Sequence, residues 1–467
     1  MESQVTESEL QEQPQVVKAE AERSENVLDR FVPRKVLINR SWVMNGGLAI
    51  LDQGLFTGSN FVISVLLARW LPAEQYGSYA IAFAVFVLLL NLCQAVLLEP
   101  MLVYGSSTYR NCLRGYLKSL LLLHLGVTSV IVFILCVSAG VVLRLGQQNG
   151  LPGALVGVAF AAPCVVLFWL AKRAFYLKLS PAPSVGGALL YCALAIGGLT
   201  LVYRHGLLSP LSALLLMGLA GLGASVVLLI CLGLRLPSSH DAPTLLDTCH
   251  QHCRYGRWAV GANVMMWIPV SIYYPLLSSF SGMAQAGELK ALMNFASPVL
   301  QACAALTPLM LPYAVRVLEE KGDSGISFAL RRMTLLCVSG VVPYWLLLLV
   351  FKGPAFRMLY SGRYTEVANL LPIVALVSLF GGAFYGPSNT LRSMGLPRLV
   401  FAAVSVSTCI SIAIGIPLTR NLGVKGAVWS MTLSEALSFV SAVVLLRRMA
   451  RGALQSVPTV PVLSTSK

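Results

Sequence analysis

The sequence predicts an all-α polytopic membrane protein, and three observations lead to that prediction. First, 57% of its 467 residues are hydrophobic and only 11% are charged, whereas soluble domains contain about 25% charged residues. Second, apolar segments of about 20 residues, enough to cross a bilayer as a helix, recur along the chain. Third, Lys and Arg gather between these segments, as is typical of membrane proteins. The net charge of +15 therefore indicates membrane orientation, and we predict no nucleic-acid partner.

We expect about twelve transmembrane helices, because most connections between the apolar segments carry Gly or Pro, which end helices. With the N-terminus inside, most of the 34 Lys and Arg residues fall on the cytoplasmic side. This bias predicts a multi-pass protein with both termini in the cytoplasm. The expected spans are residues 42–68, 76–104, 118–143, 151–171, 183–203, 207–234, 258–280, 289–313, 333–351, 367–387, 399–418 and 422–446.

The spans divide six and six around the longest inner loop. The segment Gln75-Tyr76-Gly77 resembles Gln285-Ala286-Gly287, and both lie between two long apolar segments. This repetition suggests two halves with similar plans. The acidic N-terminal tail has few apolar residues to bury, so we expect it to be disordered. The predicted division is a cytoplasmic tail at 1–41, a six-helix bundle at 42–234, a cytoplasmic loop at 235–257, a second bundle at 258–448 and a cytoplasmic tail at 449–467.

Polar side chains recur along one face of several spans. In lipid such groups turn toward the protein interior. They either hydrogen-bond neighbouring helices together or line a hydrophilic cavity between two repeats, as in transporters. Matching spans of the two halves are polar, and this favours the cavity. The candidate cavity residues are Asp52, Asn60, Arg69, Asn91, Glu99, Asn263, Asn294, Gln301, Tyr385, Asn389 and Arg392.

The ionisable members of this set differ in position. A charge near the middle of the membrane costs about 2.5–3.5 kcal/mol on insertion scales, so Asp52 requires a partner or a role. It either pairs with a basic group or carries a coupling proton or cation. Glu99 and Arg392 lie near the inner ends of their spans, where an interfacial position is equally reasonable. Arg69, at the outer end of the first span, can extend its charge to the membrane surface.

One cluster has the composition of a metal site. Residues 249–253 read Cys-His-Gln-His-Cys, but no second half with zinc-type spacing follows. We interpret this stretch as an amphipathic lead-in to the seventh span. The sequence also has no phosphate-binding loop and no Ser-His-Asp arrangement in a soluble domain. We therefore predict no metal, no cofactor and no enzymatic activity.

The segment from Ala68 to Gly77, ARWLPAEQYG, resembles the signature after the first helix of the polysaccharide transporters. These are the Wzx-type flippases of the MATE-like multidrug/oligosaccharidyl-lipid/polysaccharide exporter superfamily. Further segments match in order over about residues 42–448. They are YGRW at 255–258, AGELKA at 286–291, LP at 311–312, MLYSGRY at 358–364 and GVKGA at 423–427.

The resemblance implies two six-helix bundles around a central V-shaped cavity that opens alternately to each side. It implies a bacterial inner-membrane flippase that moves a polyprenyl-diphosphate-linked oligosaccharide, the repeat unit of a surface or exopolysaccharide, from the cytoplasmic to the periplasmic leaflet. Its partners would be this lipid-linked oligosaccharide, membrane lipids and other polysaccharide-assembly proteins. In this family, cationic cavity residues contact the diphosphate, and the candidates for this role here are Arg69, Arg316 and Arg392.

Two other functions compete with this interpretation. A MATE-like drug or cation antiporter would use Asp52 to carry a proton or sodium ion. A membrane-embedded glycosyl- or acyltransferase would need an acid/base pair at a membrane face, for which the sequence offers only Glu99 and scattered His residues.

Overall fold

The computed structural model describes residues 40–106, 108–146, 150–178, 180–233 and 243–455. The chain divides into two compact units, residues 1–49 and 50–467. Of the first unit only the beginning of one helix is described. The predicted N-terminal tail and much of the predicted inner loop and C-terminal tail thus lie outside the described residues.

The described residues form helices and no strands. Twelve helical stretches are long and apolar enough to cross a membrane, which confirms the predicted number. The helices of the first half are α2 (Arg40–Trp70), α3 (Ala73–Cys93), η1 (Gln94–Leu98), α4 (Glu99–Ser106), η2 (Arg110–Cys112), α5 (Leu113–Arg144), α6 (Leu151–Leu177), α7 (Ala182–Arg204) and α8 (Pro210–Leu232). Those of the second half are α9 (Leu245–Ser271), α10 (Tyr273–Phe280), α11 (Met283–Lys321), α12 (Asp323–Val350), α13 (Lys352–Tyr360), η3 (Thr365–Leu370), α14 (Leu371–Ser393), α15 (Pro397–Leu422) and α16 (Val424–Gln455).

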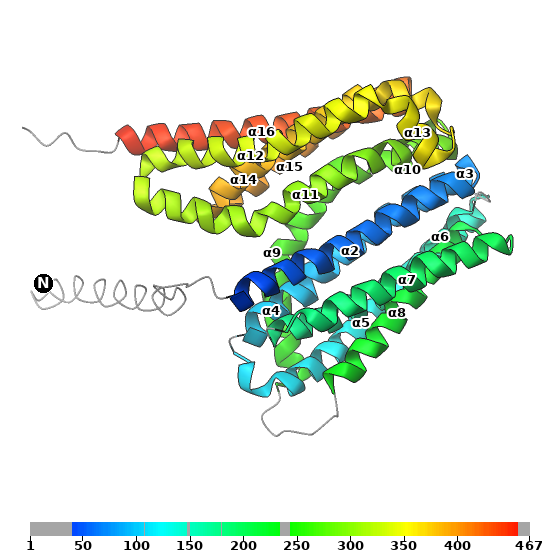
Figure 1. Cartoon of the computed structure of the whole chain (residues 1–467), viewed down its shortest axis with the longest axis horizontal. Coiled ribbons are helices and arrows are strands. Elements are labelled where there is room, and N and C mark those ends of the chain that lie inside the picture. Colours follow the sequence, from blue (N-terminus) through cyan, green and yellow to red (C-terminus); the bar gives the residue numbers. More distant parts are fainter. Residues whose placement is uncertain (1–39, 107, 147–149, 179, 234–242, 456–467) are drawn as a thin grey trace, which may run out of the picture. The chain divides into compact units, whose positions relative to one another are not determined.

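Within the unit 50–467 the helices form two groups, which we call the first bundle (α2–α8, from Ile50) and the second bundle (α11–α16). Figure 1 shows the second bundle from yellow-green to red on one side and the first from blue to green on the other, with α9 between them. Short connections make consecutive helices antiparallel. We name the two ends of the bundles by residues that lie there: the Pro72 end, with the α2–α3 turn, and the Arg392 end, with the end of α14.

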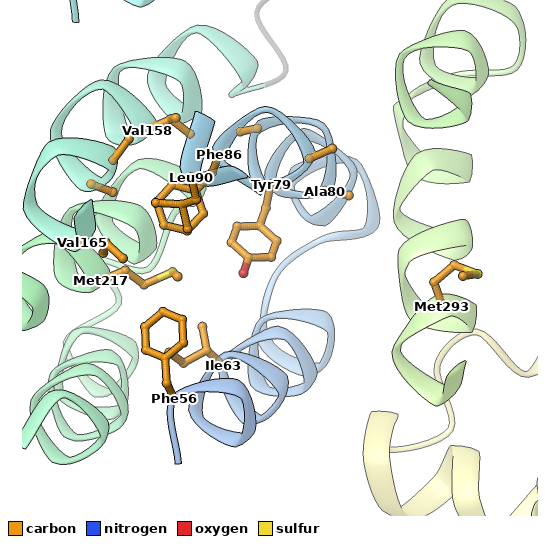
Figure 2. Packing of buried hydrophobic residues seen from close by; sticks show 14 of the residues in the cluster. Phe56, Ile63, Tyr79, Ala80, Phe86, Leu90, Val158, Val165, Met217 and Met293 are labelled. Atoms are coloured by element: carbon orange, nitrogen blue, oxygen red, sulfur yellow. The ribbon is translucent and has the colours of Figure 1, made fainter. Parts of the chain in front are cut away.

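The core of the first bundle is apolar and aromatic. Phe56 of α2, Phe86 of α3, Val165 of α6 and Met217 of α8 are buried together (Figure 2). The Phe56 ring lies 5.1 Å from that of Tyr191 on α7, between ring centroids. Side chains from five helices thus hold this bundle together through van der Waals packing, because lipid provides no hydrophobic driving force between membrane helices.

Two helices are interrupted where Pro removes a backbone donor. Pro100 cannot donate to the carbonyl of Val96, and the preceding turn is the π-helical η1. In the seventh span, Pro269 is followed by the break between α9 and α10 at Ile272. The missing backbone donor of Pro269 accounts for this break.

The ends of three predicted segments need correction. The fourth span was predicted to end at residue 171, but α6 continues to Leu177 and carries Lys172 and Arg173 inside the helix. The predicted inner loop 235–257 is helical from Leu245, in agreement with the amphipathic lead-in. The eighth helix begins at Met283 rather than at residue 289.

The bundles meet closely at the Pro72 end, where two glycines face each other. A Cβ on Gly77 of α3 would overlap the carbonyl oxygen of Met283, and a Cβ on Gly287 of α11 would lie 2.9 Å from the carbonyl oxygen of Ala73. Only glycine allows backbones to come this near. The two motifs that the sequence places at matching positions of the halves are therefore in contact.

Replacing Gly77 with Ala should separate α3 from α11 at this contact. Overpacking of this kind costs about 1–3 kcal/mol, so the thermal midpoint of the purified protein in detergent should fall. The matched control is Gly58→Ala on α2, where a Cβ meets nothing within 4 Å. An equal midpoint for both variants would contradict the close contact.

Candidate functional site

The amide of Asn294 on α11 joins the two bundles. Its Oδ1 accepts from Ser64 Oγ of α2 at 3.0 Å, and its Nδ2 donates to Tyr76 Oη of α3 at 3.0 Å and to Tyr360 Oη of α13 at 3.3 Å. Tyr360 in turn donates to the carbonyl of Ala291 at 2.8 Å. The sequence predicts Asn294 as a cavity residue, but the structure buries it in this network.

A second connection at the Pro72 end comes from Arg363. Its Nη1 donates to the carbonyl oxygens of Ala68 at 3.3 Å, Arg69 at 3.0 Å and Leu71. Ala68 and Arg69 belong to the last turn of α2 and Leu71 follows it. Carbonyls at a helix end lack helical donors, and Pro72 has no N–H for that of Ala68. Arg363 thus caps a helix of the opposite bundle, and its charge suits the negative end of that helix.

The turn that carries Arg363 is conformationally costly. Tyr364, the next residue, has φ +62°, a left-handed conformation that costs a non-glycine residue roughly 1–2 kcal/mol. Its ring packs near Tyr76 and Tyr360, with centroids 6.1 and 5.7 Å apart. Burial raises the pKa of the Tyr364 phenol to about 12. This packing holds the turn and directs Arg363 toward α2.

The hydrogen bonds found directly between the two bundles within the described residues lie toward the Pro72 end. Nearer the other end, α9 mediates the connection. Trp267 Nε1 donates to the carbonyl of Ala84 at 2.9 Å, and Asn263 Nδ2 to that of Asn91 at 3.2 Å. The cavity candidates Asn263 and Asn91 therefore meet through a helix-to-helix bond.

Asp52, the buried carboxylate of α2, is ion-paired. Lys172 Nζ of α6 lies 2.7 Å from its Oδ1, and Tyr176 Oη donates to its Oδ2 at 2.7 Å. Lys172 also lies over the Phe56 and Phe168 rings, 5.6 and 5.1 Å from their centroids. Of the two roles that the sequence leaves open for Asp52, this geometry corresponds to pairing with a basic group.

Lys172 is not among the residues predicted from the sequence, because the fourth span is predicted to end at residue 171. A signal was present, since Lys172 and Tyr176 have the i, i+4 spacing that puts both on one helix face. A buried carboxylate is stable only with a partner of opposite charge. The need of Asp52 for a basic partner therefore favours a fourth span that includes Lys172.

Glu99 of α4 is half-buried beside the first bundle. Its Oε1 accepts from Gln94 Nε2 at 3.4 Å, and it interacts electrostatically with the guanidinium of Arg173 on α6. The π-helical turn η1 begins at Gln94 and ends directly before Glu99. It changes the helix register between Asn91 and Glu99.

The Cys-His-Gln-His-Cys stretch lies at the start of α9 and attaches that helix to the first bundle. His252 Nδ1 lies 2.8 Å from the Val96 carbonyl, the group that Pro100 leaves unpaired. Its Nε2 lies 2.8 Å from Tyr116 Oη, and Tyr109 Oη donates to Gln251 Oε1 at 2.9 Å. These contacts fit a neutral imidazole with its proton on Nδ1. Among the described residues, no three or more His, Cys, Asp or Glu side chains lie together in a way that could hold a metal ion.

A cation that the sequence analysis did not select lies between the bundles. Lys290 Nζ of α11 is 4.4 Å from the centroid of the Phe83 ring of α3. It has no carboxylate within ion-pair distance among the described residues. Lys290 belongs to a motif that we noted, but we placed it at the beginning of the eighth span, near the surface. Because α11 begins at Met283, Lys290 lies two turns inside the helix.

The other candidates divide into buried and exposed groups. Tyr191 Oη donates to Asn60 Oδ1 at 3.2 Å, and Asn389 Nδ2 lies 3.5 Å from the Met310 sulfur. Tyr385 of α14 is half-buried. The exposed side chains are Arg69, Gln301, Arg316 and Arg392. The structure thus spreads the predicted residues over several small polar sites in one compact unit.

Two pockets in the described part of the chain lie elsewhere. One of about 280 Å³ lies between α11 and α12, and one of about 440 Å³ between α7 and α8. Both linings are mainly apolar, so neither coincides with the polar residues described above.

The Asp52–Lys172 pair should show strong coupling in unfolding experiments. Lys172→Met leaves a buried carboxylate unpaired, and breaking such a pair costs about 3–5 kcal/mol. The double variant Asp52→Asn/Lys172→Met removes both charges and should cost much less than the sum of the single variants. Denaturation in mixed micelles gives the free energy of unfolding of the wild type, the two single variants and the double variant. Additive effects would contradict a direct interaction.

The attachment of α9 should weaken at acidic pH. Burial lowers the pKa of His252, while its hydrogen bond to Val96 partly opposes this effect. The neutral form therefore stabilises the fold above the ordinary His pKa of about 6.5, and that contribution is lost as the pH falls through the lowered folded-state pKa. Hydrogen-exchange protection factors of residues 245–257 should drop between pH 7.5 and 5.

The control for this experiment is the neighbouring His250, which is exposed. His250→Ala should keep the pH dependence of protection. His252→Ala should weaken protection at pH 7.5 and should remove most of the pH dependence. An unchanged pH dependence in His252→Ala would show that another group controls the attachment.

The fold has solved counterparts. The inward-facing conformation of a multidrug resistance MATE family transporter of the MOP superfamily aligns with a TM-score of 0.70 and 12% identity, over 87% of this chain and 96% of that one. The lipid II flippase MurJ in an inward closed conformation aligns with a TM-score of 0.66 and 12% identity, over 87% of both chains. The MATE multidrug transporter DinF-BH gives 0.60 and 18% identity, over 88% and 96%. At these identities the likeness shows the fold, which is the predicted one.

A search of curated proteins gave no match. The profile of the family described as "Polysaccharide biosynthesis protein" matches residues 66–369, which is more than half of the chain. The matched region runs from the end of α2 to η3 and so includes Asn294, Lys290 and Arg363. The protein is a multi-pass membrane protein with a transporter fold, and it belongs to the polysaccharide biosynthesis family.

Proposed function

We propose that this protein is a flippase that translocates a polyprenyl-diphosphate-linked oligosaccharide by alternating access. The observation that carries the proposal is Lys290, a cation inside the membrane-spanning part of α11 that faces α3 of the other bundle. Membership of the polysaccharide biosynthesis family supplies the saccharide.

An ionised side chain inside the membrane costs about 2.5–3.5 kcal/mol on insertion scales. Lys172 offsets this cost by pairing with Asp52, whereas Lys290 has only the Phe83 ring, whose cation–π attraction gives about 0.5–2 kcal/mol. A phosphate group would complete the compensation, because ammonium and phosphate attract strongly in surroundings of low dielectric constant. The exposed Arg316 and Arg392 of the second bundle would attract the diphosphate before it reaches Lys290.

The position of the junction supports an inward-facing state. The direct hydrogen bonds between the bundles lie toward the Pro72 end, and the charge bias of the loops favours the opposite end as cytoplasmic. On this proposal the headgroup enters from the Arg392 end while its lipid tail stays in the bilayer. Opening of the Asn294 and Arg363 contacts then releases it on the other side.

We also propose that the protein lies in a bacterial inner membrane, with both termini in the cytoplasm, as the charge bias of its loops favours. Its partners would be the lipid-linked oligosaccharide, membrane lipids and other proteins of polysaccharide assembly. No enzymatic step is required, because the substrate is moved and not changed. The antiporter alternative loses its main support, since the carboxylate of Asp52 is already neutralised by Lys172.

A strain that lacks the protein should accumulate complete lipid-linked repeat units on the cytoplasmic leaflet and lose its surface polysaccharide. Lys290→Ala should fail to restore export, because it removes the phosphate-binding cation. Lys290→Arg, which keeps the charge, should restore at least part of it. Mass spectrometry of extracted lipid-linked sugars and quantification of surface polysaccharide measure both effects.

The matched control is Lys352→Ala, which removes an exposed cation at the start of α13 and should restore export fully. Immunoblots of isolated membranes confirm equal amounts of the variants. Normal export with Lys290→Ala would remove this residue from the mechanism. Intact polysaccharide with no trapped repeat unit in the deletion strain would contradict the proposed function.

A further inference from the structure

The second bundle contains a carboxyl group that none of the interactions above uses. Glu435 lies near the middle of α16, in the span Val424–Met449, and is half-buried. Its Oε2 and Cδ lie 3.4 and 3.5 Å from the position of a Cβ on Gly381 of α14, and a Leu300 methyl of α11 lies 3.3 Å from the same position. The missing side chain at Gly381 thus gives the carboxyl group its place between α11, α14 and α16.

Glu435 differs from Asp52, the membrane carboxylate of the first bundle. Asp52 has Lys172 and Tyr176 at 2.7 Å each, whereas Glu435 has no ion-pair partner within the part of the chain that the structure describes. The basic residue of α14 that follows Gly381 is Arg392. With a helical rise of 1.5 Å per residue, it lies about 16 Å further along the helix than Gly381.

The surroundings of Glu435 are polar and hold no ion-pair partner for it within the described residues. On α14, one turn before Gly381, the fully buried Ser378 has a hydroxyl without a hydrogen-bond partner among the described residues. One turn after it, the Tyr385 phenol interacts electrostatically with Glu435, with the thiols of Cys303 on α11 and Cys337 on α12, and with Arg392. Toward α15, Ser438 of α16 hydrogen-bonds Ser407.

We propose that Glu435 is a proton-binding site of the second bundle and that its protonation is coupled to opening of the Pro72 end. The site rests on Glu435 set against Gly381, with the unpartnered hydroxyl of Ser378 beside it and no ion pair to Glu435 within the described residues. The ligand is a proton rather than a metal ion, because a hard cation requires about six oxygen ligands, and this site offers far fewer.

This inference rests on the proposed flippase function and names its coupling ion. In the present arrangement the carboxyl group is packed without a counter-ion, so the neutral, protonated form fits it best. Ionisation favours any arrangement that gives the carboxylate more water. By linkage, proton binding must then stabilise the arrangement in which the bundles are joined at the Pro72 end.

The test is hydrogen exchange of the full-length protein in lipid nanodiscs between pH 5.5 and 8.5. Peptides that cover residues 64–83 and 283–295 report on the Pro72 end. Wild-type protection factors there should fall about fivefold or more as the pH rises, within the usual range of coupling between sites. Glu435→Gln, which imitates the protonated form, should keep high protection at every pH. Glu435→Asp should retain the pH dependence.

Glu320→Gln, which removes an exposed carboxylate of α11, should behave as the wild type, and a His252→Ala background removes the titration at α9. A wild type without pH dependence at the Pro72 end, or a Glu435→Gln variant that keeps it, overturns the inference. The measurement needs no saccharide, so the coupling site and the proposed substrate can fail independently.

Discussion

The structure depends on a single rule, which is that a polar group in a membrane-length helix must find a partner. Asn294 shows the rule most clearly, because its amide uses its oxygen and both N–H groups on side chains from α2, α3 and α13. With Gly77 and Gly287 in backbone contact beside it, this amide joins two bundles whose remaining surfaces are largely apolar. The direct hydrogen bonds between the bundles, within the described residues, lie toward the Pro72 end. A fold of this kind can open by exchanging one compact set of contacts for another.

Charges are distributed unequally between the bundles. The first bundle compensates its buried charge internally, through Asp52 and Lys172. The second holds Lys290 and Glu435, which have no ion pair within the described residues. A compensated pair stabilises one arrangement of helices, whereas an isolated charge makes its environment sensitive to whatever binds it. We therefore assign the first bundle a mainly structural role, and the second bundle the binding of substrate and proton.

The sequence predicts the helices far better than their contacts. Twelve spans, the break after Pro269 and the helical lead-in at residues 249–253 follow from hydropathy and from the chemistry of proline. The pairing of Gly77 with Gly287 could be suspected from their matching motifs. Periodicity shows which face of a helix is polar but not what that face meets. For this reason Asn294, predicted to line a cavity, lies in a packed junction in this structure. Lys172 falls just beyond its predicted span and Lys290 at the start of its own, because hydropathy alone places charged residues at helix ends.

In the proposed transport cycle the two bundles move as units, closing one end while the other opens. The most direct measurement is the distance between paired spin labels in liposomes, one pair at each end. His205 and Lys352 serve for the Pro72 end, and Lys178 and Arg398 for the Arg392 end, since all four side chains are exposed. Genetically encoded labels leave the native cysteines in place. The account predicts two populations with opposite changes, so that the Pro72 pair lengthens as the Arg392 pair shortens. A single unchanging distance at both ends, from pH 5.5 to 8.5, would contradict it.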